Sequence, residues 1–113
     1  MANATVMTRD RARGYLASVR REAERLSSKS DELVGPRAPL EDRQAFRAEW
    51  ANEVDCFTAV VRAYDAGRLD ADLVPPLFEV ARQLSDLLPL LECLKLLAPD
   101  AADLDRLKAT SAA

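Results

Sequence analysis

The sequence predicts an all-α fold, a three-helix antiparallel bundle whose third helix is kinked or split at Pro89 and is followed by a short C-terminal helix. Three observations lead to this prediction. Apolar residues recur at spacings of three and four along three segments, these segments have nearly equal lengths, and no segment shows the alternation typical of a half-buried strand. The 113 residues suit a single helical domain, and we expect residues 1–7 and 109–113 to be frayed.

The first predicted helix begins after Thr8, whose side chain suits an N-cap, and it ends at Gly35 and Pro36. One narrow apolar stripe follows it at spacings of four and three, formed by Ala12, Leu16, Val19, Ala23, Leu26, Ser30 and Leu33. The stripe is narrow and is made of small residues.

The second predicted helix opens at Pro39 and stops at Gly67. It carries nearly all of the aromatic bulk of the chain, on a stripe formed by Phe46, Trp50, Val54, Phe57, Val60, Val61 and Tyr64. We therefore expect this helix to supply most of the core.

The third predicted helix follows Asp72, whose carboxylate can cap it, and continues to Pro99. Its apolar face comprises Leu77, Val80, Ala81, Leu84, Leu87, Leu88, Leu91 and Leu94. Pro89 cannot donate a hydrogen bond to the Ser85 carbonyl, which favours a kink or a break there. Beyond Pro99, the sequence predicts a short final helix that starts near Asp100 and Asp103 and carries Leu104 and Leu107.

The stretch from Leu87 to Leu97 is unusual, because seven of its eleven residues are leucine and its only charges are Glu92 and Lys95. At about 100° per residue, these leucines would point in nearly every direction around a helix. Such a helix needs cover on more than one side, either at the centre of a bundle or against a partner. Since the final helix offers little cover, we expect an interaction surface formed by Leu87, Leu90, Leu91, Leu94, Leu96 and Leu97.

Composition and charge narrow the possible partners and locations. The chain has 16 basic and 19 acidic residues, and its net charge of −3 gives no general attraction to nucleic acid or acidic lipid. Charged residues interrupt the longest apolar region, so we predict no membrane span.

The N-terminus lacks the apolar core of a signal peptide, and Cys56 and Cys93 suit reduced thiols. We expect a cytoplasmic protein, and the bias toward arginine over lysine suggests a bacterial source.

Catalytic chemistry is poorly supported by the residues present. The chain has no histidine, which is the commonest general base and the commonest transition-metal ligand. Its two cysteines lack any recognisable zinc spacing, and its three glycines are isolated, which excludes a glycine-rich phosphate loop. We therefore predict that the chain is not an enzyme and has no catalytic residues, no cofactor and no metal site.

The charged residues offer two functional candidates, Glu53 on the second predicted helix and a set of arginines on the first. Glu53 lies at the edge of the aromatic stripe, where a semi-buried carboxylate could serve as an acid or a pH-sensitive contact. Pairing with an arginine of the first helix is the favoured interpretation. Arg20, Arg21 and Arg25 could form a basic contact face across a dimer, but the favoured interpretation is that such arginines cover the edges of a packed seam.

The leading hypothesis is a non-enzymatic helical protein-interaction protein, such as an adaptor, an assembly factor, an antitoxin-like inhibitor or a homo-oligomeric scaffold. It would bind protein, including a second copy of itself, through the leucine-rich third helix. The alternative hypothesis is a nucleic-acid-associated regulatory protein that uses the arginine-rich first helix in a dimer, with an affinity that falls steeply with salt.

Overall fold

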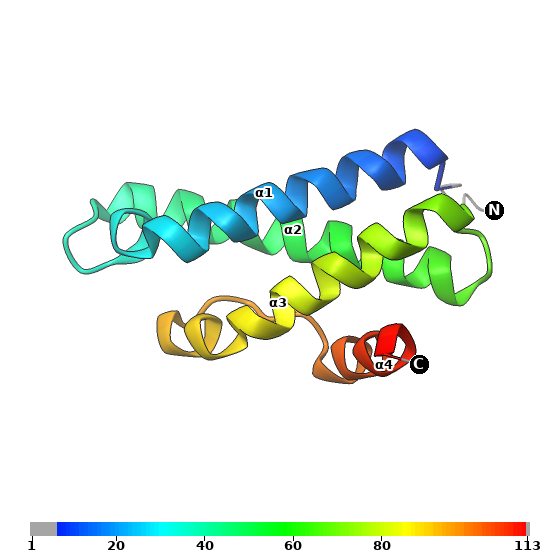
Figure 1. The fold of residues 1–113 in the computed structure, drawn as a ribbon. Coiled ribbons are helices and arrows are strands. Elements are labelled where there is room, and N and C mark those ends of the chain that lie inside the picture. The colour runs from blue at the N-terminus through cyan, green and yellow to red at the C-terminus, as the bar shows by residue number, and fades with distance from the viewer. Residues whose placement is uncertain (1–6, 113) are drawn as a thin grey trace.

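Four α-helices make up most of residues 7–112, the part of the chain that the computed structural model describes (Figure 1). Their bounds are α1 Arg9–Val34, α2 Leu40–Asp65, α3 Val74–Leu94 and α4 Ala101–Ala112, with a single 3-10 turn, η1 Ala71–Leu73, leading into α3. No strand occurs among these described residues. The all-α prediction is confirmed, and residues 1–6 and 113, which we expected to be frayed, lie outside the described residues.

Helices α1 and α2 form an antiparallel hairpin whose helices pack along most of their length (Figure 1). The hydroxyl of Thr8 accepts a hydrogen bond from the Arg11 backbone N–H at 3.1 Å, which confirms the predicted N-cap. The predicted α2 stripe is also confirmed, since all of its members are buried except Tyr64, which is half-buried. Trp50 and Phe57 are among the largest fully buried side chains, so α2 does supply much of the core.

The last turn of α1 departs from the predicted stripe. Lys29 has non-helical backbone angles of φ −133° and ψ 29°, which interrupt the helix. Beyond it the buried residue is Val34, whereas Ser30 and Leu33, the last two members of the predicted stripe, are only half-buried. An interruption of this kind rotates the residues that follow it about the helix axis, so a different side chain faces the core.

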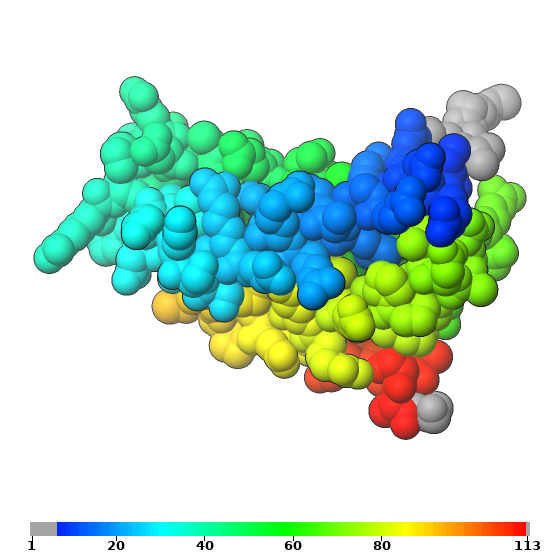
Figure 2. All heavy atoms as spheres, turned by 45° about the horizontal axis from the view of Figure 1, so that its top comes forward, coloured from blue at the N-terminus to red at the C-terminus, as the bar shows by residue number. Residues whose placement is uncertain are grey.

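Helix α3 starts at the end of the hairpin where α1 begins, and it contacts α1 more extensively than α2. Figure 2 shows α1 on one face of the molecule, α3 along its edge and α4 on the side of α3 away from α1. The extents of 44 × 36 × 20 Å correspond to a thickness of about two helix diameters. One core therefore runs through all four helices, and it includes Leu26, Leu84, Leu91 and Leu104.

Both ends of α3 differ from the predicted ones. Asp72 does not cap the helix, because its carboxylate accepts hydrogen bonds from the Arg9 guanidinium instead. The helix passes through Pro89 without splitting, but it ends at Leu94 and does not reach Pro99. The expectation of a helical stretch that includes Leu96 and Leu97 is therefore wrong, and the reason is the turn described below.

Helix α4 begins as predicted and extends further than predicted. The Asp100 carboxylate accepts a hydrogen bond from the Ala102 backbone N–H at 2.9 Å and so caps the helix. Residues 109–112, which we expected to be frayed, continue the helix to Ala112. Leu104 and Leu107 are fully buried against the core.

Candidate interaction surface

The leucine-rich segment turns sharply at Lys95, which adopts a left-handed conformation with φ 57° and ψ 39°. The Leu96 backbone N–H donates to the Leu91 carbonyl at 2.9 Å, and that of Lys95 donates to the Glu92 carbonyl at 3.1 Å. These two bonds form a Schellman motif, which ends a helix and folds the next residue back over it. Leu96 is consequently buried, although it lies beyond the end of α3.

Two side chains of α2 hold this turn in place. The Arg47 guanidinium donates to the carbonyls of Lys95 at 2.8 Å and Leu94 at 3.0 Å. The indole N–H of Trp50, which is only 1% exposed, donates to the Leu97 carbonyl at 2.8 Å. Carbonyls at the end of a helix lack partners within the helix, so these bonds satisfy groups that would otherwise need water.

The six leucines of the expected interaction surface divide into three classes. Leu87, Leu91 and Leu96 are buried within the chain, so they are not available to a partner as the sequence analysis expected. Leu90 and Leu94 are half-buried, and Leu97 is 51% exposed. The chain covers more of the segment than expected, because the turn at Lys95 brings Leu96 inward and α4 packs against α3.

The most exposed large apolar side chain of the described residues is one that the sequence analysis missed. Leu40, the first residue of α2, is 59% exposed. It precedes Arg47 by seven residues and therefore lies on the same face of α2, two turns earlier, and Arg47 contacts the end of α3. Leu40 belongs to none of the predicted apolar stripes. Its position directly after Pro39, at the start of the helix, is the one sequence feature that could have drawn attention to it. We call Leu40, Leu90, Leu94 and Leu97 the leucine edge.

Charged residues and the Cys93 thiol accompany the leucine edge. Glu92 and Lys95 are exposed beside Leu94, and Arg47 is exposed on α2. Cys93 is an exposed free thiol in the last turn of α3, whereas Cys56 is a half-buried free thiol in α2. Burial raises the pKa of the Cys56 thiol, and the nearby carboxylates of Glu53 and Asp55 raise it further. The edge thus combines apolar side chains with charges of both signs.

Glu53 is half-buried, but its partner is not the arginine that the sequence analysis favoured. Its Oε1 atom accepts a hydrogen bond from the Ser18 hydroxyl of α1 at 2.8 Å. The bond joins α1 to α2 midway along the hairpin and satisfies a carboxylate next to the aromatic core. Among residues 7–112, no group of three or more His, Cys, Asp or Glu side chains is placed to hold a metal ion.

The expected basic face on α1, formed by Arg20, Arg21 and Arg25, has acidic side chains next to it. Arg20 lies 3.4 Å from Glu24, and Arg25 lies 3.1 Å from Glu22. The Arg25 guanidinium also lies 5.9 Å from the centre of the Phe46 ring, so this arginine covers the seam between α1 and α2. Arg21 is exposed and has no ion pair within residues 7–112. The three arginines therefore do not form an unopposed positive surface.

Comparison with protein-family models, curated proteins and solved structures finds no match to this chain. Within residues 7–112, no helix combines the length with the hydrophobicity that crossing a membrane requires.

Proposed function

We propose that this chain is a non-enzymatic helical protein-interaction protein, an adaptor, assembly factor or inhibitor, and that it self-associates through the leucine edge. The observation that carries this proposal is that Leu40 and Leu97 are the only exposed large apolar side chains of the described residues. Helical periodicity puts Leu40 on the face of α2 that carries Arg47, and Arg47 binds the end of α3. Leu90 and Leu94, in the last turns of α3, are half-buried and so still present apolar atoms near the turn that leads to Leu97.

A second copy of this chain suits the leucine edge for two reasons. A two-fold contact places the same patch of both subunits together, so leucines meet leucines. The same operation can bring Glu92 of one copy toward Lys95 or Arg47 of the other, which would fix the orientation of the contact. The absence of histidine from the whole sequence favours a binding function over catalysis.

Sedimentation velocity of the purified protein over a range of concentrations tests this proposal. We expect the unmodified chain to sediment as a dimer at high concentration and Leu97→Glu to sediment as a monomer, because a buried carboxylate at the contact opposes association. Ala109→Glu is the matched control, since it adds the same charge at an exposed site on α4. A monomer at every concentration for the unmodified chain would contradict self-association.

Nucleic-acid association through Arg20, Arg21 and Arg25 receives less support, because Glu22 and Glu24 offset two of these charges. A salt titration of oligonucleotide binding tests this alternative. A steep loss of affinity with salt that is reduced in Arg21→Ala would favour it over self-association.

We also propose that α1, α2 and α3 form an antiparallel three-helix bundle to which α4 adds a cover, and that α3 is kinked at Pro89. The antiparallel hairpin, the shared core and the missing N–H of Pro89 support this description. Residual dipolar couplings of Pro89→Ala compared with the unmodified chain would measure the kink.

A further inference from the structure

A groove lies at the opposite end of the hairpin from the leucine edge, where α1 begins and α2 ends. Its volume between these two helices is about 470 Å³. Arg11 and Tyr15 of α1 line one wall of the groove. Arg62 of α2 and Arg68, which lies just beyond the end of α2, line the other wall. Ala59 and Ala63 lie between them on α2, where their small side chains leave space for a ligand.

Local structure places two of the arginines at this groove. The Thr8 cap holds the first turn of α1, and with it the backbone of Arg11. At the end of α2, Gly67 is left-handed with φ 71°, and the Arg68 backbone N–H donates to the Ala63 carbonyl at 2.8 Å. This Schellman motif folds Arg68 back toward the groove instead of away from the helix end.

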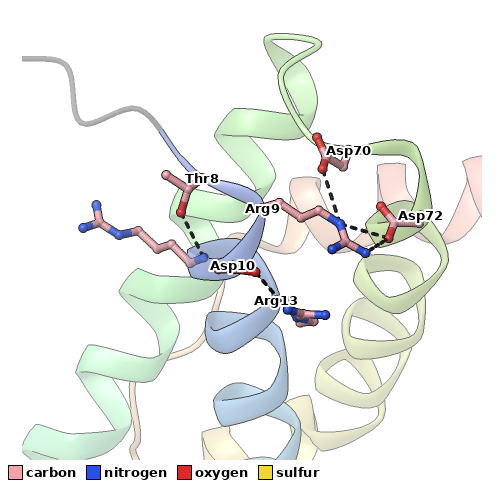
Figure 3. Close-up of polar contacts among 7 residues, drawn as sticks. Thr8, Arg9, Asp10, Arg13, Asp70 and Asp72 are labelled. Carbon is pink, nitrogen blue, oxygen red and sulfur yellow. Dashed lines mark hydrogen bonds and ion pairs between the residues drawn. The ribbon is translucent and has the colours of Figure 1, made fainter.

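The acidic residues closest in sequence to the groove are engaged by other arginines. Figure 3 shows Arg9 directed toward Asp70 and Asp72, and Arg13 directed toward Asp10. The hydrogen bond from Arg9 lowers the pKa of the Asp72 carboxyl, which keeps this pair charged.

At the end of α2, Arg106 of α4 binds Asp65 through two nitrogen atoms, at 2.7 and 3.1 Å. Asp65, which is the one acidic residue between Arg62 and Arg68 in the sequence, is thus also occupied. A bidentate arginine–carboxylate pair has fixed geometry, so Asp65 is held by α4 and does not turn toward the groove.

The groove therefore concentrates positive charge in a chain whose net charge is −3. No Asp or Glu is among its lining residues. Arg11, Arg62 and Arg68 form no ion pair within residues 7–112. Residues 1–6, whose sequence is MANATV, contain no acidic side chain that could neutralise them.

We propose that this groove binds a small organic molecule that carries a diphosphate group and a flat or apolar body. Three guanidinium groups match the charge of a diphosphate, and arginine donates to phosphate oxygens through paired N–H groups. The alanines and Tyr15 would contact the body of the ligand, and the volume lies within the range of small-molecule sites.

Isothermal titration calorimetry with ADP and with inorganic pyrophosphate tests this assignment. We expect both probes to bind, ADP more tightly, and Arg62→Ala and Arg11→Ala each to weaken ADP binding about tenfold, the effect of losing one charge-assisted hydrogen bond. Arg21→Ala is the matched control, because it removes an exposed arginine of α1 that does not line the groove. Circular dichroism melting curves would verify that each variant is folded.

Three outcomes would overturn the proposal. The first is no heat of binding for either probe, and the second is an equal loss of affinity in Arg21→Ala. The third is tighter binding of a single-stranded oligonucleotide or an acidic peptide than of ADP, with the same dependence on Arg11 and Arg62. Each result is independent of self-association, since the groove and the leucine edge share no residue.

Discussion

Helices α2 and α3 end in the same way with different residues. In α2 the left-handed residue is Gly67, with φ 71°, and in α3 it is Lys95, with φ 57°. In both helices, the next N–H donates to the carbonyl five residues earlier, at 2.8 Å from Arg68 and at 2.9 Å from Leu96. Glycine adopts a left-handed conformation without steric cost, whereas lysine does not.

The difference shows that local sequence ends α2, whereas tertiary contacts end α3. After Gly67 comes Arg68, which is exposed. After Lys95 comes Leu96, which is buried, and the Arg47 and Trp50 side chains bind the carbonyls around it. Burial of Leu96 and these hydrogen bonds offset the steric cost at Lys95.

The largest effect is expected from removing the apolar anchor of the α3 turn. Leu96→Ala should lower the free energy of unfolding by roughly 2–5 kcal/mol, because it removes a buried leucine and leaves a cavity. Its neighbour provides the control at a protein concentration where the chain is monomeric, since Leu97→Ala then removes an exposed side chain and should change stability by less than about 0.5 kcal/mol. Urea unfolding of both variants measures the two values. Equal effects would contradict the assignment of Leu96 as the anchor.

A smaller effect is expected from the hydrogen bond between α2 and the same turn. Trp50→Phe should lower the free energy of unfolding by about 1–3 kcal/mol, since it removes the donor to the Leu97 carbonyl and leaves part of the indole volume empty. Hydrogen exchange of the Lys95 and Leu96 amides should accelerate more than that of the Gly67 and Arg68 amides. Equal acceleration at both helix ends would show that the bond does not act locally.

Gly67→Ala should lower the free energy of unfolding by about 1 kcal/mol, because the alanine side chain disfavours the left-handed conformation that ends α2. Gly14→Ala is the matched control. Gly14 lies within α1 with no atom near the position of a new Cβ, so this variant should gain about 0.5–1 kcal/mol. Thermal unfolding compares the two variants, and changes of the same sign would contradict this account of Gly67.

The smallest effect is expected from making the α3 turn resemble that of α2. Lys95→Gly should raise the free energy of unfolding by roughly 0.5 kcal/mol. Removing the steric cost of a left-handed lysine stabilises the folded chain, and we expect this gain to exceed the stabilisation of the unfolded chain by the greater conformational entropy of glycine. Urea unfolding, repeated to reach this precision, measures the change. A loss of stability would mean that the lysine side chain contributes to the turn.

The sequence by itself predicted the helical class, the Thr8 cap and the stripes of α2 and most of α1. These features depend on residues within a few turns of one another, so periodicity and capping rules are sufficient. It also predicted the end of α2 at Gly67, where one residue type carries the signal. Leu91 of α3 and Leu104 and Leu107 of α4 are buried, as the periodicity of apolar residues predicted.

Tertiary structure decided the features that depend on distant residues. The end of α3 requires Arg47 and Trp50, which are nearly fifty residues away, and the start of α3 leaves Asp72 with Arg9 instead of the helix cap. The Arg11, Arg62 and Arg68 groove arises only when the two helices lie side by side. Such contacts join side chains with no fixed spacing along the chain, so no periodic pattern reveals them, and the folded packing alone selects which leucines and arginines stay exposed.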